Sequence, residues 1–267
     1  MKKILLITFI CSLTSLCSAG IDFDGVDDYL CKDNPSTATM PSAAPFSVSA
    51  WIYPDSIHAS ENNRVFTYGE RSGADSGFSF GLLGEGTDEL RLTTLGVQDY
   101  NTTAMTVVTG EWQFIAVSLD ASFDATFYHY RLSTDTLTTD TFDWNVDMNT
   151  PDATSDIFIG IITGNDVGAT CSSSKEAEFD GKIDDVKVYD TDLSQAQIEL
   201  DFRSRMRRLL IADSNRKGYW LLDDVSDGVS ADGTNILDFE GLNTLVGVDG
   251  ANNTGLLGSA SEVQSYP

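Results

Sequence analysis

Short runs of alternating apolar and polar residues recur along most of this 267-residue chain. In the run 46–52, Phe46 and Val48 face one side and Trp51 faces the other, because successive side chains of a β-strand point in opposite directions. We read the side of Phe46 as core. Trp51 fits either a covered packing position or a sugar-facing surface, and we favour the covered position because tryptophans are usually largely buried.

Similar runs, with turn residues between them, predict an all-β protein. Segments rich in Gly, Asp and Ser, such as 72–77 and 84–88, separate the runs. Many short strands at such spacing are typical of a sandwich or a barrel. Strand-like runs are expected at 46–52, 64–68, 78–83, 89–95, 106–108, 113–119, 126–132, 156–162 and 182–189.

One helix is expected after the last strand, because Leu193, Ile198 and Phe202 recur at helical spacing.

Four motifs follow one another along the chain: 23–30 (FDGVDDYL), 46–52 (FSVSAWI), 110–117 (GEWQFIAV) and 179–190 (FDGKIDDVKVYD). Together and in this order, they resemble the laminin-G-like family of concanavalin-A-like jelly rolls over roughly 21–202. The resemblance implies a two-sheet antiparallel jelly-roll sandwich that ends in one short helix.

The N-terminus reads as a secretory signal peptide. Lys2 and Lys3 precede an apolar run at 4–16 that is too short for a membrane span, and small residues end the segment at Ala19. A lipoprotein signal is the alternative. We expect a signal peptide at 1–19, a laminin-G-like domain at 20–208 and a C-terminal extension at 209–267. The protein is then secreted, extracellular or at the cell surface, with the periplasm as an alternative.

The C-terminal extension contains a strand in an unusual place. The segment 217–224 (KGYWLLDD) resembles the strand that begins such a domain, yet here it follows the domain. It can fold back and complete its own sheet, or it can add to a neighbouring molecule by strand donation. A third option is the remnant of a truncated second domain.

The chain is strongly acidic, with 41 Asp and Glu against 16 Lys and Arg and a net charge of −25. Such a field repels nucleic acid and anionic membrane surfaces, so we expect neither as a partner. No long apolar stretch follows the signal, and we expect no membrane insertion. The charge favours divalent cations, or it serves solubility in a salty medium where self-repulsion is screened.

Catalytic motifs are missing from the sequence. Enzymes of this fold carry a Glu-x-Asp-x-x-Glu strand or one closely similar, which places the nucleophile and the acid close together, and this chain has none. His58 and His129 are the only histidines, and neither has the partner spacing of a zinc site. We therefore predict a protein that is not an enzyme, with a polysaccharide hydrolase using an atypical carboxylate pair as a weaker alternative.

The resemblance implies a structural calcium where the first and last strands meet. Calcium takes six to eight oxygen ligands, and the family pattern places one of them on Asp184. Asp22 and Asp24 are the nearest further carboxylates, and the Gly69 region can supply a carbonyl. The alternative is that these aspartates only cap turns.

The resemblance also places the two cysteines outside the predicted signal on neighbouring strands. Cys31 follows the first strand and Cys171 precedes the last one. Export favours a disulfide between them over two separate thiols.

A lectin-like binding or adhesion module for glycans or glycosylated surfaces is the function that fits best. Aromatic stacking and polar contacts would bind the carbohydrate, with calcium holding loops. The alternative is a structural subunit of a surface or extracellular assembly, which self-associates through its C-terminal strand. The candidate ligand-binding aromatics are Tyr100, Tyr128, Tyr130 and Trp144.

Overall fold

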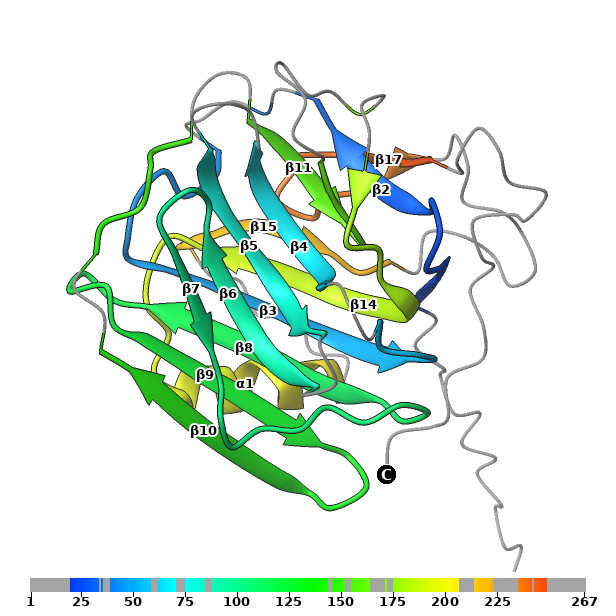
Figure 1. Cartoon of the computed structure of the whole chain (residues 1–267), viewed down its shortest axis with the longest axis vertical. Helices are drawn as coiled ribbons and strands as arrows, with labels where there is room; N and C mark the ends of the chain where they lie inside the picture. The colour runs from blue at the N-terminus through cyan, green and yellow to red at the C-terminus, as the bar shows by residue number, and fades with distance from the viewer. Residues whose placement is uncertain are drawn as a thin grey trace, which may run out of the picture.

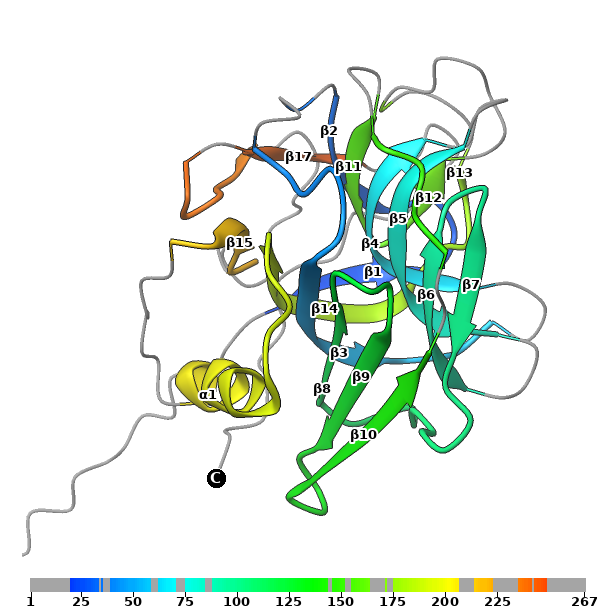
Figure 2. The same ribbon diagram turned by 90° about the vertical axis from the view of Figure 1, so that its left-hand side faces the viewer.

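Two antiparallel sheets packed face to face form the body of the protein in the computed structural model (Figure 1, Figure 2). The prediction of an all-β two-sheet sandwich with one short helix is confirmed. The predicted signal peptide lies outside the described residues. The structure describes residues 20–33, 35, 39–58, 62–70, 75–84, 88–143, 146–151, 155–163, 171, 175–206, 214–222, 235–241 and 243–248.

The strands that neighbour one another in space are mostly distant in sequence. The first sheet, called sheet A, has the order β1 (Ile21–Asp24), β14 (Asp180–Tyr189), β3 (Phe46–Pro54), β8 (Gln113–Leu119), β9 (Ala125–Arg131) and β10 (Thr136–Phe142), with β15 (Arg216–Trp220) also paired to β14. Sheet B has the order β16 (Asn235–Ile236), β17 (Leu245–Val248), β2 (Tyr29–Lys32), β11 (Asp156–Ile159), β4 (Asn63–Glu70), β5 (Ser76–Leu83), β6 (Glu89–Thr94) and β7 (Gln98–Asn101). A separate two-stranded ladder joins β12 (Ile162–Thr163) to β13 (Lys175–Glu176).

The main core lies between the two sheets and is rich in phenylalanine. Phe46 of β3 and Phe78 of β5 stack with their ring centroids 4.1 Å apart, which joins the sheets directly. Phe66 of β4 lies 6.0 Å from Phe78 and continues the cluster. Phe46 and Val48 face this core as the alternation predicts. The inner faces are therefore held by apolar burial, the main favourable term in folding.

A second apolar cluster covers the outer face of sheet A. Helix α1 (Gln195–Met206) lies on that face (Figure 2), and Phe202 stacks on Tyr130 at 4.4 Å. Trp51 is fully buried there, so its expected covered position is confirmed. The helix begins with a capping box, because the Gln197 side chain accepts hydrogen bonds from the backbone and hydroxyl of Ser194. In the described part of the chain, no helix is both long and apolar enough to cross a membrane.

The segment after α1 packs on the chain's own sandwich. Strand β15 pairs with the second half of β14, from Val186 opposite Trp220 to Val188 opposite Gly218. Strand β1 pairs with the first half of the same edge, so β15 continues the line that β1 begins. The Trp220 indole is buried and donates a hydrogen bond to the Asn243 carbonyl at 2.8 Å.

One disulfide ties β2 of sheet B to the segment before β14. Cys31 of β2 bonds to Cys171, with their Cα atoms 5.9 Å apart. Cys31 pairs with Phe158 of β11 and with Val246 of β17, so the bond anchors a strand that is held on both sides. The disulfide therefore joins two residues that are separated by most of the domain's sequence.

His129 is buried in the middle of sheet A. Its Nε2 lies 2.9 Å from the Gln113 Oε1, and the Gln113 amide donates to the Val108 carbonyl at 2.6 Å. Burial, together with the positive charge of Arg131, lowers the pKa of His129 from 6.5 to about 4. The imidazole is thus held neutral inside the sheet, in a packing role.

Replacing Cys31 and Cys171 by serine will lower the free energy of unfolding. The two residues are 140 positions apart, and the chain-entropy model gives about 5 kcal/mol for a loop of this length. Urea unfolding of the variant and the oxidised parent measures the difference. Equal midpoints and slopes for the two proteins would contradict the prediction.

His129→Gln will remove part of the acid sensitivity of the fold. Below pH 6.5 the unfolded chain binds a proton at this histidine, whereas the folded chain does so only near pH 4. The unfolding free energy therefore falls between those pH values, by up to roughly 3 kcal/mol for the shift to about 4.

The measurement compares urea unfolding of His129→Gln and parent protein at pH 7 and pH 4.5. Carboxylates titrate in both proteins, so their contribution cancels in the comparison. The variant should lose less stability on acidification, and an equal loss in both proteins would refute the assignment.

Candidate groove on the outer face of sheet B

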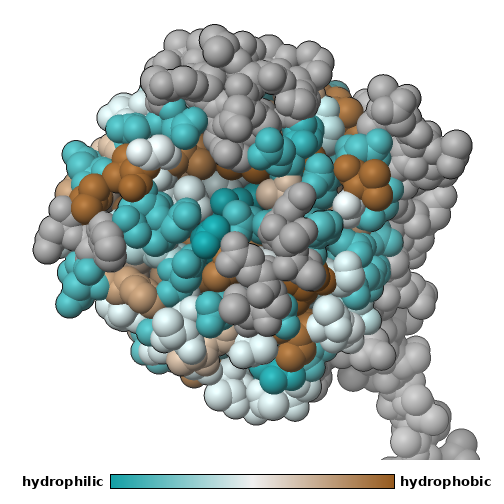
Figure 3. Space-filling view, in the orientation of Figure 1, coloured by the Kyte–Doolittle hydropathy of each residue, from teal (hydrophilic) through white to brown (hydrophobic). Residues whose placement is uncertain are grey.

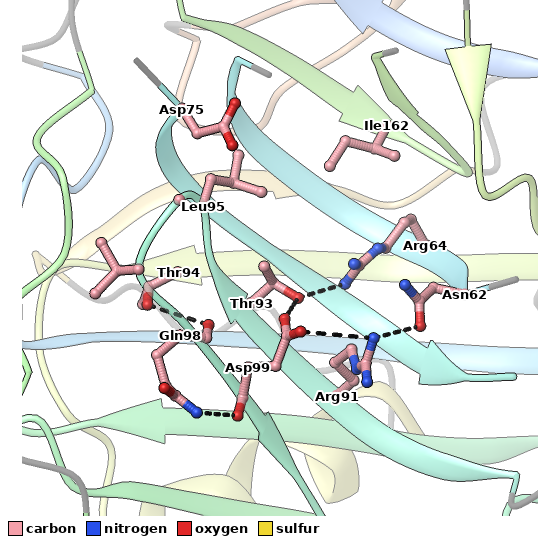
Figure 4. Close-up of a pocket in the computed structure, with 12 residues that line it drawn as sticks. Asn62, Arg64, Asp75, Arg91, Thr93, Thr94, Leu95, Gln98, Asp99 and Ile162 are labelled. Carbon is pink, nitrogen blue, oxygen red and sulfur yellow. Dashed lines mark hydrogen bonds and ion pairs between the residues drawn. The ribbon is translucent and has the colours of Figure 1, made fainter. Parts of the chain in front are cut away.

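A polar groove crosses the outer face of sheet B over β4, β6 and β7. Alternation creates it, because Leu90 and Leu92 of β6 point into the core while Arg91 and Thr93 point outward. Figure 3 shows hydrophilic surface in the middle of this face. The groove encloses about 500 Å³. The labelled lining residues in Figure 4 are Asn62, Arg64, Asp75, Arg91, Thr93, Thr94, Leu95, Gln98, Asp99 and Ile162.

Arg91 is fixed at the floor of the groove by three neighbours. Its Nε donates to the Asn101 Oδ1 at 2.7 Å, and its Nη1 donates to the Asn62 Oδ1 at 2.9 Å. The Asp99 carboxylate lies 3.8 Å from the same Nη1. The guanidinium therefore has one orientation, which lowers the entropy that a ligand contact would have to remove.

Arg64 lies on β4, which β5 separates from the β6 strand of Arg91. Its side chain is almost completely buried. Its Nη1 donates to the Thr93 Oγ1 at 3.1 Å, and the Thr93 hydroxyl donates to the Asp99 carboxylate at 2.7 Å. Asp99 thus connects the two arginines through one ion pair and one hydroxyl (Figure 4). The result is a single hydrogen-bonded network across the groove.

The turn between β6 and β7 forms one wall. Gly96 has φ +71°, and a Cβ atom there would lie 2.7 Å from the Cβ of Asp75. Glycine is required for both reasons, since the left-handed conformation and the close approach exclude a side chain. The wall also carries Gln98, whose amide donates to the Asp99 carbonyl at 2.7 Å. The groove is thus lined by this turn as well as by the strands.

The groove presents fixed guanidinium and amide groups beside carboxylate, hydroxyl and amide oxygens. Such an array binds a polar ligand by hydrogen bonds to several of its groups at once, in a largely preformed site. Arginine presents two parallel donors to a vicinal pair of oxygens. Arg64 and Arg91 were not among the candidate residues predicted from the sequence, although the alternation of 89–95 places Arg91 on the face opposite the leucines.

The aromatic residues chosen from the sequence do not form a stacking surface. Tyr100 belongs to the main core, and Tyr128 and Tyr130 lie in the cluster beneath α1. All three rings are buried, so the structure corrects the expectation that they contact a glycan. Trp144 lies outside the described residues.

The four expected calcium ligands do not come together. Asp184 is fully buried opposite Trp51 of β3, and Asp22 lies 3.8 Å from the Lys182 ammonium. Gly69 lies in sheet B, where it pairs with Asp156 of β11, whereas Asp24 lies on β1 of sheet A.

Asp24 instead lies close to two other carboxylates of its own turn. Asp24, Asp27 and Asp28 each offer one carboxylate oxygen, and these oxygens lie within 4.8 Å of one another. The Asp24 carboxylate also accepts from the Val26 amide at 2.9 Å, as in an Asx-turn. Asp27 and Asp28 were not among the expected ligands, although they lie beside Asp24 in the same 23–30 segment. This acidic cluster can hold a metal ion, since all of its donors are hard oxygens.

Solved structures share this fold at low sequence identity. A Bacteroides ovatus protein to which carbohydrate binding has been attributed is 18% identical, with 92% of this chain and 61% of that chain covered and a TM-score of 0.59. This chain therefore spans less than two thirds of that protein. The enzymatically active domain of bacteriophage CBA120 tailspike protein 2 is 13% identical, with 76% and 30% covered and a TM-score of 0.51. A pentraxin of Limulus polyphemus is 17% identical, with 67% and 79% covered and a TM-score of 0.48.

A comparison with curated proteins finds no match. The model of a laminin G family, described as the concanavalin A-like lectin/glucanases superfamily, matches residues 24–199, more than half of the chain. This match confirms the resemblance seen in the four motifs. With two antiparallel sheets in the expected arrangement, the chain belongs to the laminin-G-like family within the concanavalin A-like lectin/glucanase superfamily.

Proposed function

We propose that this protein is an exported, non-catalytic module that binds hydroxyl-rich glycans in the groove of sheet B. The observation that carries the proposal is the fixed network around Arg91, which presents donors and acceptors on an open, polar face. Sugar hydroxyls both donate and accept hydrogen bonds, so they match such a mixed array. Binding sites of this kind work by preformed polar contacts.

The Asp99 carboxylate of the groove has a structural role, which fits a binding site better than a catalytic site. Asp99 accepts from the Thr93 hydroxyl and pairs with Arg91, so its charge holds the two arginines in place. The carbohydrate binding attributed to the Bacteroides ovatus relative supports this choice of ligand. The disulfide between Cys31 and Cys171 supports export, because such bonds persist in oxidising compartments.

The alternative of strand donation to a neighbouring subunit lacks support in the structure. The strand that motivated it, β15, pairs with β14 of its own chain, and Trp220 is buried in the main core. A donated strand would have to leave these contacts. We therefore place the function in the groove and not in the C-terminal segment.

Arg91→Gln will weaken glycan binding at least tenfold. The change removes a charged donor that three neighbours hold in place, and hydrogen bonds to charged groups are worth about 1.5–3 kcal/mol. A glycan array first identifies a ligand, and isothermal titration then compares the proteins. Arg64→Gln should behave similarly, since Arg64 belongs to the same network.

Arg131→Gln is the matched control. Arg131 also makes a close ion pair, with Glu111 at 2.7 Å, but it lies on β9 of the other sheet. Binding should survive this change. Equal loss in the control and in Arg91→Gln, or binding that is insensitive to all three changes, would place the site elsewhere.

We also propose that the cluster of Asp24, Asp27 and Asp28 binds a structural calcium ion. Three hard oxygen donors on one turn fit calcium, and backbone carbonyls and water would complete its six to eight ligands. The ion would relieve the repulsion between the carboxylates and hold the loop between β1 and β2. The ion would have no catalytic role.

Calcium should raise the unfolding temperature of the parent protein but not that of Asp28→Asn. At a concentration one hundred times the dissociation constant, a bound ion stabilises by about 2.7 kcal/mol. Differential scanning calorimetry with and without EDTA measures the effect. Asp120→Asn is the control, because Asp120 caps a similar turn through the Ser122 amide at 2.7 Å, outside the cluster. A calcium response that persists in Asp28→Asn would contradict this site.

A further inference from the structure

A lysine and two carboxylates meet inside the outer layer of sheet A. The Lys187 Nζ lies 2.8 Å from the Asp185 Oδ2 and 2.5 Å from the Asp201 Oδ1. Lys187 and Asp185 belong to β14, whereas Asp201 comes from α1. The side chains of Lys187, Asp185 and Asp201 are 2%, 0% and 6% exposed. Water is therefore almost absent from this group.

The neighbours orient the three side chains. Ser49 of β3 lies opposite Lys187 and donates its hydroxyl hydrogen to the Asp201 Oδ2 at 2.6 Å. On the other side, Tyr219 of β15 pairs with Lys187, and its ring centroid lies 4.8 Å from the Nζ. The two oxygens of Asp201 are thus distinguished, since one faces the amine and the other faces a hydroxyl.

We propose that Lys187 and Asp201 form an intramolecular isopeptide bond, promoted by Asp185. The amine nitrogen already lies within contact of the carboxyl group that it would attack. A second carboxylate touches the same nitrogen and can move its protons. The proposed bond is independent of the groove and of the calcium site.

The reaction is a condensation that releases water and needs no other reactant. The Nζ of Lys187 begins as an ammonium and passes a proton to Asp185, and the free amine attacks the Cγ of Asp201. A C–N bond forms, and the C–O bond to Oδ1 breaks. Two protons from nitrogen reach Oδ1 through Asp185, Oδ1 leaves as water, and the third proton stays on the amide. Asp185 returns to its starting state.

Ser49 assists the step by its position. Negative charge develops on the Asp201 Oδ2 in the tetrahedral intermediate, and this is the oxygen that the Ser49 hydroxyl already contacts. A fixed donor at a developing oxyanion lowers the barrier. After water leaves, Oδ2 is the amide oxygen and keeps the same hydrogen bond.

Proximity makes this condensation feasible inside the protein. Well-oriented intramolecular reactions reach effective concentrations of about 10⁵–10⁸ M. Burial would lower the pKa of Lys187, but the charges of Asp185 and Asp201 outweigh it and raise that pKa. The amine is therefore protonated at the start, and Asp185 has to act as the base.

Trypsin and mass spectrometry test the proposal directly. Trypsin cleaves after lysine and arginine, so unmodified protein yields peptides 183–187 and 188–203. An acylated Lys187 resists cleavage. Full-length protein, unfolded, reduced and digested, should instead yield peptide 183–203 with the mass of one water missing.

Three variants complete the test. Lys187→Arg keeps the charge but cannot form the amide, so cleavage at 187 should return with no mass deficit. Asp185→Asn lacks the proton relay and should also be cleaved. Asp192→Asn changes an exposed aspartate of the same peptide and should keep the cross-link. Circular dichroism of each variant verifies the β-sandwich.

A buried ion pair without a covalent bond gives a different result. Parent protein that releases peptides 183–187 and 188–203 in full yield overturns the proposal. A missing water that persists in Lys187→Arg overturns it too, because that outcome assigns the loss to a succinimide at an aspartate.

Discussion

The central strands of sheet A, β14, β3 and β8, are buried on both faces, and the rest of the molecule follows from this constraint. Their inner face packs on sheet B and their outer face packs under α1, so neighbouring residues such as Trp51 and Ile52 are both fully buried. Strands covered on two sides read as nearly continuous apolar runs. Polar groups that remain in such a layer need partners of their own, as His129 and Lys187 have.

Sheet B differs from sheet A, because the outer face of β6 and β7 is open to solvent. Their side chains alternate, with leucine and tyrosine inward and arginine, threonine and aspartate outward. The open face is therefore where the fold can present chemistry to solvent. Burying most of Arg64 there costs desolvation, which its hydrogen bond to Thr93 and the nearby Asp99 charge offset.

The sequence predicts the strands well and the site poorly, for a physical reason. Local alternation identifies strand faces, but it does not show that α1, far along the chain, covers the side where Tyr128 and Tyr130 point. Likewise, Arg64 and Arg91 become neighbours only through the pairing of β4, β5 and β6. Register decides such meetings, and a single sequence does not state register.

If the groove binds glycans as proposed, its charges favour neutral over anionic ones. The chain carries a net charge of −25, yet that field is screened beyond about 8 Å at physiological ionic strength. Asp99 and Asp75 line the groove together with Arg64 and Arg91, so the groove holds two charges of each sign. Its local field is dipolar. Hydroxyl groups, which are dipoles themselves, gain from such a field, whereas a polyanion would gain from two charges and be repelled by the others.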